Sequence, residues 1–114
     1  MTTTTITNTF TVRGVWHHRH ACDHVHMLAC VEFVPEPGNA YDPQAIKLVV
    51  TESPIGALHI GYVPRELTEF VHPLLPLQGW VSKLSFDGDK PLVEVSFDAG
   101  VFIPTQMPQW KGGK

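Results

Sequence analysis

The chain has 114 residues, of which 43% are hydrophobic and 17% charged, so we expect one globular domain with a modest core and not a disordered chain. Its formal net charge of -3 lacks the basic excess of proteins that grip duplex backbone over a long track. Any contact with nucleic acid should therefore be local. The longest apolar runs are too short to span a membrane, so we expect no membrane contact.

The N-terminal segment and the two cysteines favour a cytoplasmic protein. Residues 1–8 have neither a basic start nor an apolar stretch, so we interpret them as a polar lead-in and not as a signal peptide. The spacing of Cys22 and Cys30 matches neither a redox pair nor a zinc knuckle. We therefore expect two free thiols in a reducing compartment.

Alternating hydrophobic residues predict about six short strands, within residues 9–16, 25–35, 45–50, 57–63, 79–86 and 91–97. In the second of these, one face would comprise Val25, Met27, Ala29, Val31 and Phe33. An Asp-Gly pair between the last two segments is typical of a tight turn, so Trp80 to Phe97 should form a hairpin.

One helix is predicted over residues 64–75, with Leu67, Phe70, Val71 and Leu74 at helical spacing. Pro64 suits the first helical position, and Pro73 should end or kink the helix near His72. These elements indicate a mainly β (α+β) fold: a small closed or half-closed barrel of about six strands, with one or two short helices covering a mouth. We expect this domain at residues 9–104, followed by an irregular tail at 105–114.

The segment before the third strand has a rigid, turn-rich sequence. Residues 36–39 predict a type II turn with a positive φ at Gly38. Asp42 precedes a proline, so its side chain should accept a hydrogen bond from the backbone N–H of Gln44 or Ala45.

Two interpretations of this loop remain open at the level of sequence. In the structural one, Asp42 caps a turn and Tyr41 packs on the core. In the functional one, prolines at both ends hold the loop rigid, and Asn39, Tyr41 and Asp42 face a ligand.

Two sequence blocks, residues 33–50 and 56–67, carry a family resemblance. The matching positions are Glu36, Pro37, Asn39, Tyr41, Asp42, Ala45 and Ile46, followed by Gly61, Tyr62, Pro64, Arg65 and Glu66. In their order and spacing these blocks resemble the HIRAN domain. The resemblance implies an OB-like β-barrel that binds the free 3′-hydroxyl end of single-stranded DNA. It also implies a role in DNA repair or replication-fork processing, beside a separate helicase or nuclease.

The resemblance assigns roles to several side chains. Tyr41 would stack on the terminal base and Asp42 would accept a hydrogen bond from the 3′ hydroxyl, with Asn39 nearby. Arg65 would meet a phosphate, although a solvated first-turn arginine is the alternative. Tyr62 would point into the core unless Gly61 forms a bulge, in which case it would form a wall of the pocket.

The first strand departs from the family pattern. Trp16 and His17 occupy the positions of an arginine-tyrosine pair in DNA-binding members, so a fixed positive charge is lost. Trp16 can stack, His17 can stack or donate, and Arg13 or Arg19 could compensate for the charge. Because His17 and His18 could gain charge below about pH 6.5, binding could strengthen in acid.

The histidine-rich segment suggests a separate hypothesis. If this segment were extended, one face would carry His18, His20, Cys22, His24 and His26. Imidazole and thiolate suit zinc, copper or nickel. Ligands spaced two residues apart on one strand do not close a tetrahedral site, so a solvent-exposed loop without metal is the alternative.

The sequence contains neither a carboxylate cluster of the two-metal type nor a nucleophile motif, so we predict a binding protein without catalysis or a cofactor. A protein-interaction module on the same barrel, with the DNA pocket lost, is the alternative function. It would present the histidine loop and the Trp110 tail to a partner. A groove flanked by Arg65, Arg13 and Lys47 would favour DNA.

Overall fold

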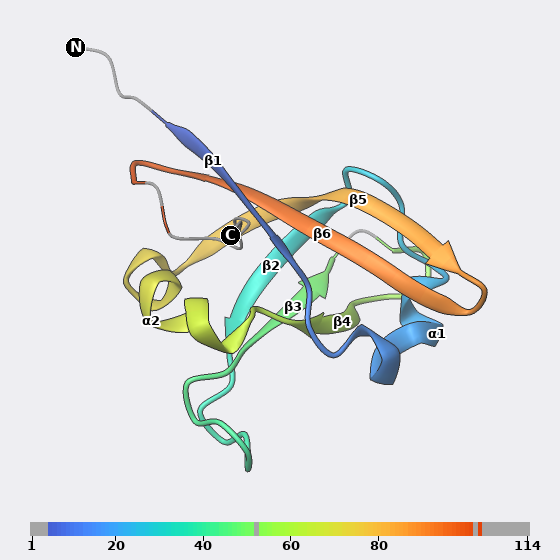
Figure 1. Cartoon of the computed structure of the whole chain (residues 1–114), viewed down its shortest axis with the longest axis horizontal. Helices are drawn as coiled ribbons and strands as arrows, with labels where there is room; N and C mark the ends of the chain where they lie inside the picture. Colours follow the sequence, from blue (N-terminus) through green and yellow to red (C-terminus); the bar gives the residue numbers. More distant parts are fainter. Residues whose placement is uncertain (1–4, 52, 102, 104–114) are drawn as a thin grey trace, which may run out of the picture.

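A computed structural model describes residues 5–51, 53–101 and 103. Six strands form one antiparallel sheet in the order β1-β6-β5-β2-β3-β4. They are β1 (Ile6–Thr11), β2 (Cys30–Pro35), β3 (Ile46–Val50), β4 (Leu58–Tyr62), β5 (Leu77–Asp87) and β6 (Lys90–Ala99). The sheet curls into a half-barrel with short helices at its margins, as Figure 1 shows. The predicted mainly β fold is confirmed.

The helical segments of the described residues are all short. They are η1 (Val15–His18), α1 (Arg19–Cys22), η2 (Arg65–Leu67), α2 (Thr68–Val71) and η3 (His72–Leu74), where η marks a 3₁₀ turn. None of them has the combination of length and apolar character that a membrane crossing requires.

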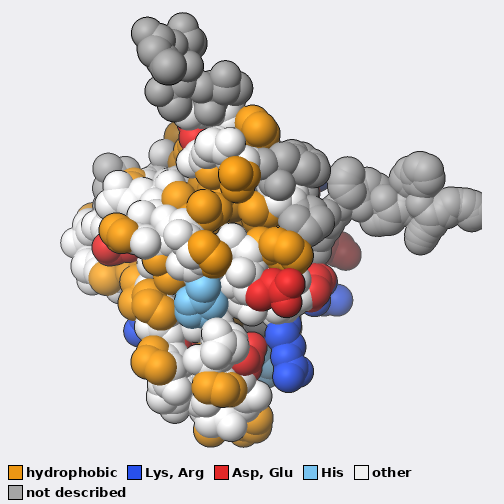
Figure 2. Space-filling model, turned by 90° about the vertical axis from the view of Figure 1, so that its left-hand side faces the viewer, with side chains coloured by type: hydrophobic (Ala, Val, Ile, Leu, Met, Phe, Trp, Pro, Cys, Tyr) orange, Lys and Arg blue, Asp and Glu red, His pale blue; other side chains and the backbone are white. Residues whose placement is uncertain are grey.

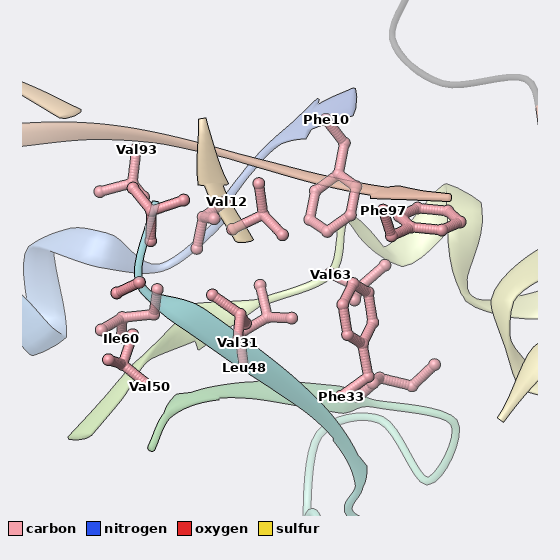
Figure 3. Close-up of a cluster of buried hydrophobic side chains, with 14 of the residues drawn as sticks. Phe10, Val12, Val31, Phe33, Leu48, Val50, Ile60, Val63, Val93 and Phe97 are labelled. Carbon is pink, nitrogen blue, oxygen red and sulfur yellow. The ribbon is translucent and has the colours of Figure 1, made fainter. Parts of the chain in front are cut away.

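The core lies inside the curl of the sheet and follows the predicted alternation. Strand β3 buries Ile46, Leu48 and Val50, and β6 buries Val93, Val95 and Phe97. Aromatic side chains from three strands meet there: the ring centroids of Phe10, Phe33 and Phe97 lie 5.5–6.2 Å apart. Figure 3 shows these rings together with the buried valines. Such pairs stabilise a core by about 0.5–1.5 kcal/mol beyond their buried area, and here they tie β1 to β2 and β6.

Among the described residues, an isolated β-bridge connects the segment after β1 to β4, and β1 and β4 are the two edge strands of the sheet. Just after β1, the backbone N–H and carbonyl of Arg13 exchange hydrogen bonds of 2.9 Å with those of Tyr62, at the end of β4. Gly61 makes this approach possible, because a Cβ there would lie 2.5 Å from Cγ1 of Val12 and 2.6 Å from the Arg13 carbonyl oxygen. The closure therefore brings Arg13 and Tyr62 together at one end of the half-barrel.

The predicted hairpin is confirmed. Strands β5 and β6 pair from Trp80–Ser96 to Asp87–Lys90, and Gly88 takes a φ of 66° in the turn. This φ lies in the left-handed region, where glycine has no steric cost.

The prediction of a strand over residues 25–35 is wrong for its first half. Residues 25–29 form turns, in which Ala29 N–H donates to the His26 carbonyl and Leu28 N–H donates to the Val81 carbonyl. Met27, predicted to share a face with core residues, is 50% exposed. The alternation held for β2 itself, where Val31 and Phe33 are buried.

The predicted helix is interrupted. Pro64 has a ψ of 136° and precedes the first turn instead of occupying it. The α-helical turn α2 ends at Val71, as Pro73 predicts. Leu67 and Val71 are buried, but Phe70 is 39% exposed. The segment mixes 3₁₀ and α turns, so a constant 3.6-residue period does not describe which side chains face the core.

The chain ends differ from the expectation at one terminus. Strand β1 begins at Ile6, inside the segment interpreted as a lead-in, and Asn8 is buried. The Asn8 side chain accepts a 2.9 Å hydrogen bond from the N–H of Ile103 and donates one of 3.1 Å to the Val101 carbonyl. These bonds fasten the segment after β6 to β1. The expected tail at 105–114, including Trp110, lies outside the described residues.

Candidate functional site

A cavity of about 640 Å³ opens where the Arg13–Tyr62 bridge joins the ends of the sheet. Its lining comprises Arg13, His17, His18, Asn39, Tyr41, Asp42, Ala45, Tyr62, Val63 and Arg65. The volume falls within the range of about 300–1,000 Å³ that is usual for small-molecule sites. Six of the seven predicted site residues line it, and Trp16 lies outside. The predicted site did not include Ala45, directly before β3, or Val63, directly after β4, which also line the cavity.

The loop between β2 and β3, which projects below the sheet in Figure 1, is organised by Asn39. The Asn39 Oδ1 accepts hydrogen bonds from the backbone N–H groups of Tyr41 (2.8 Å) and Asp42 (3.0 Å). The Asp42 Oδ1 accepts one of 2.9 Å from the N–H of Gln44, which confirms the predicted cap. Short polar side chains therefore fix the backbone that presents Tyr41 and Asp42.

Two details of the loop prediction are wrong. Asn39 N–H does donate to the Glu36 carbonyl at 3.0 Å, but Gly38 lacks the positive φ of a type II turn. Tyr41 is 93% exposed and does not pack on the core. Asp42 thus caps the turn, as the structural interpretation expects, whereas the Tyr41 ring is exposed and lines the cavity.

Tyr62 faces the cavity because β4 contains an irregularity. The pairing of β3 with β4 shifts between Leu48 and Val49, so that Leu48 opposes Gly61 and Val49 opposes His59. Ile60 and Val63 are buried on the core side, whereas Tyr62 is only half-buried and lines the cavity. The bulge that the sequence analysis made the condition for this placement is present.

One carboxylate connects the loop with β4. The Glu36 Oε1 accepts 2.8 Å hydrogen bonds from the Tyr62 hydroxyl and from the side-chain amide of Asn39. The bond from Asn39 has the larger effect and the bond from Tyr62 the next, and both lower the pKa of Glu36 below its ordinary value. Burial and the neighbouring Glu36 raise the pKa of Tyr62. The phenol therefore stays protonated and acts as the donor.

The fixed cations around the cavity are paired with carboxylates. The Arg13 Nη2 lies 3.0 Å from the Glu66 Oε2, and the Arg65 Nε lies 3.9 Å from the Asp42 Oδ2.

Lys47, whose position beside the groove would have favoured DNA, is not part of the lining, and its Nζ lies 3.9 Å from the Glu36 Oε2. On the face shown in Figure 2, Lys and Arg side chains likewise lie next to Asp and Glu side chains. The surroundings of the cavity thus have mixed charge.

Trp16 does not reach the cavity. It is 42% exposed, and the guanidinium carbon of Arg19 lies 4.0 Å from its ring centroid. The Arg19 Nη1 also donates a 2.8 Å hydrogen bond to the Trp16 carbonyl. Of the two arginines considered as replacements for the lost charge, Arg13 lines the cavity and Arg19 binds to Trp16 instead.

A stacked histidine pair joins the cavity lining, where His18 lies, to His59 of β4. The rings of His18 and His59 have centroids 4.0 Å apart at an interplanar angle of 35°, and His59 also meets Tyr62 edge-on at 4.9 Å. Burial, then His17, lowers the pKa of His18, and burial, then His18, lowers the pKa of His59. His18 therefore gains its charge further below pH 6.5 than an ordinary histidine does, because its protonation requires more acid.

The face proposed for metal binding does not form. Residues 19–22 are helical, so the alternating side chains of this segment do not share one face. Cys22 is buried, and burial raises the pKa of its thiol to about 11, which disfavours the thiolate that metals require. Within residues 5–51, 53–101 and 103, no three His, Cys, Asp or Glu side chains gather in a group that could hold a metal ion.

Neither the curated proteins nor the solved structures gave a match. A family model, the HIRAN domain, matches residues 9–89. This range contains β1 from Thr9, the strands β2 to β5 and every residue that lines the cavity. HIRAN domains are DNA-binding modules and are not themselves catalytic. The chain belongs to the HIRAN domain family.

Proposed function

We propose that this chain captures the 3′-hydroxyl end of single-stranded DNA in the cavity at the Arg13–Tyr62 bridge. One observation carries the proposal: the fold gathers Asn39, Tyr41, Asp42, Tyr62 and Arg65 around a single cavity. These residues come from two blocks that are separated in the sequence by β3 and most of β4. A DNA-binding family and a cavity of nucleotide size support the same function.

The proposed roles follow from the chemistry of each side chain. The exposed ring of Tyr41 offers a face to a terminal base, and such stacking contributes about 1–3 kcal/mol whatever the base. The Asp42 Oδ1 is occupied by the Gln44 N–H, while its Oδ2 retains capacity to accept a hydrogen bond from a hydroxyl. A terminal phosphate at the same place would face this carboxylate and be repelled.

We further propose that the chain binds DNA without transforming it, in the cytoplasm and beside a separate helicase or nuclease of DNA repair or replication-fork processing. The cavity is lined by cations, histidines and aromatic rings, with Asp42 as its carboxylate. A set with one carboxylate suits recognition of an end better than two-metal hydrolysis, which needs several.

The test compares two oligonucleotides that differ in their 3′ end. Fluorescence anisotropy would measure the affinity for a short labelled single strand with a 3′ hydroxyl and for the same strand with a 3′ phosphate, at two salt concentrations. We expect the hydroxyl end to bind more tightly. Asp42→Asn should reduce this preference, because the amide keeps the Oδ1 acceptor of the cap but loses the charge that repels phosphate.

Asp89→Asn is the matched control, since Asp89 lies exposed in the β5–β6 turn, away from this cavity. It should leave the preference unchanged. Equal affinity for both ends, or no binding at tens of micromolar, would contradict end capture. A protein-interaction module would then be the better explanation of the exposed Tyr41 and of the paired charges around the cavity.

A further inference from the structure

The proposed function requires the cavity to bind a phosphodiester. The positive charges of its lining arginines are nevertheless paired with carboxylates. Both arginines of its lining face carboxylates, Arg13 at 3.0 Å from Glu66 and Arg65 at 3.9 Å from Asp42. Proteins that bind nucleic-acid backbone through fixed cations release counterions from the phosphates they neutralise. Here a phosphate would have to compete with Glu66 or Asp42 for each arginine.

Two histidines offer a different source of charge. His17 and His18 line the cavity, and the ring of His18 stacks on His59 at 4.0 Å. The Nε2 of His59 lies 3.1 Å from the Gly61 carbonyl oxygen, which can only accept, so this nitrogen carries the hydrogen. The pair can take one proton and remain stacked as an imidazolium on a neutral imidazole. A second proton would place two cations in contact.

We propose that the cavity binds a nucleic-acid phosphate together with one proton, which the stacked His18–His59 pair takes up. This inference rests on the proposed function, because a phosphate must enter the cavity. It adds a regulatory property, in which affinity for the DNA end follows pH. Burial and then His18 lower the pKa of His59, and the two ring centroids lie 4.0 Å apart, so we assign the proton to the pair and not to one ring.

Some groups that face the histidine pair raise the pKa of its rings, and others lower it. Glu36 favours the charged form of both rings, while His17 disfavours charge on His18 and Lys47 disfavours it on His59. The Tyr62 ring lies edge-on to both histidine rings, with centroids 6.3 Å from His18 and 4.9 Å from His59. Its hydroxyl donates to Glu36 and stays protonated. Burial is the largest influence: it disfavours the charged form and lowers the pKa of both rings. A phosphate beside His18 adds the negative charge that reverses this preference.

Calorimetry of the full chain measures the proton directly. A short thymidine oligonucleotide with a free 3′ hydroxyl would be titrated near pH 6.5 in two buffers of different ionisation enthalpy. We expect the apparent binding enthalpy to differ between the buffers by an amount corresponding to uptake of up to about one proton. The affinity should increase as pH falls, by at most about tenfold per pH unit for one proton.

Variants assign the proton to the pair. His18→Gln and His59→Gln should each reduce the uptake and flatten the pH dependence. His24→Gln should behave like the parent chain, because His24 is exposed and lies outside the cavity. Circular dichroism at each pH would establish that the variants are folded, and the buffer comparison on the parent chain needs no variant.

The outcomes separate this inference from the function on which it rests. Binding with an enthalpy that is the same in both buffers would overturn proton uptake and leave end capture intact. Uptake that persists in the double variant His18→Gln/His59→Gln would overturn the role of the pair. No binding at any pH would overturn both proposals.

Discussion

At the scale of single residues, Tyr41 and Asp42 are neighbours with different surroundings. Asp42 is half-buried and bonded to the Gln44 N–H, so its position is fixed by the loop. Tyr41 is fixed only through its backbone, by the bond from its N–H to Asn39, and its ring is exposed. An exposed aromatic ring contributes little to folding, so its contribution to binding can be measured separately.

Tyr41→Ala should weaken binding of a single-stranded 3′ end by about 1–3 kcal/mol, or roughly five- to 150-fold, because one base loses its stacking partner. Tyr41→Phe keeps the ring and should bind like the parent chain. Thermal unfolding of both variants should match the parent within about 0.5 kcal/mol. If Tyr41→Ala bound as tightly as Tyr41→Phe, the ring would have no part in the site.

At the scale of elements, the site depends on how β1 and β4 approach each other. The bridge between Arg13 and Tyr62 holds a backbone junction under the cavity. Gly61 takes a φ of 149° there and leaves no room for a side chain. The glycine thus serves the bulge, the closure and the outward turn of Tyr62 together.

Gly61→Ala should destabilise the fold by about 1–3 kcal/mol or more, because the new methyl group would overlap Val12 and the Arg13 carbonyl. Gly38→Ala is the matched control: a Cβ there meets nothing within 4 Å, and its φ is not positive. It should change stability by less than about 1 kcal/mol. Chemical denaturation of both variants would measure the difference, and equal stabilities would contradict the tight approach.

At the scale of the whole molecule, the titrating groups make stability depend on pH. The pKa values of His18 and His59 are lowered from 6.5, so between the lowered values and 6.5 the folded chain binds fewer protons than the unfolded chain. Stability is therefore lost as pH falls through this window. Glu36 acts at lower pH: its contribution is present above 4.5 and is lost as pH falls through its own lowered pKa.

Thermal unfolding between about pH 7.5 and pH 5.5 should show this loss as a falling midpoint. His18→Gln should lose less stability over the same range, because one of the two stacked rings no longer has to charge. His24→Gln, which alters an exposed histidine outside the cavity, should follow the parent chain. A parent chain with the same midpoint at both pH values would contradict the lowered pKa values.

Much of the fold could be predicted from local sequence patterns. Alternation placed β3 and β6 with their buried faces, and the Asp-Gly pair placed the hairpin. Strand alternation failed at residues 25–29, where the chain forms turns. Helical spacing failed at Phe70, because the segment mixes 3₁₀ and α turns. The extended face considered for the histidine segment does not form for the same reason, since residues 15–22 fold as η1 and α1.

Local sequence predicted those features of the cavity lining that depend on near neighbours. The cap of Asp42 on Gln44 joins residues two positions apart, and the motif blocks contain Tyr41, Asp42, Tyr62 and Arg65, which line the cavity. The contacts between distant segments depend on the folded chain. It pairs Arg13 with Glu66, stacks His18 on His59 and turns Trp16 away towards Arg19. The first two contacts join residues far apart in the chain, and all three depend on the curl and closure of the sheet and on the helical turns after β1, which no local pattern encodes.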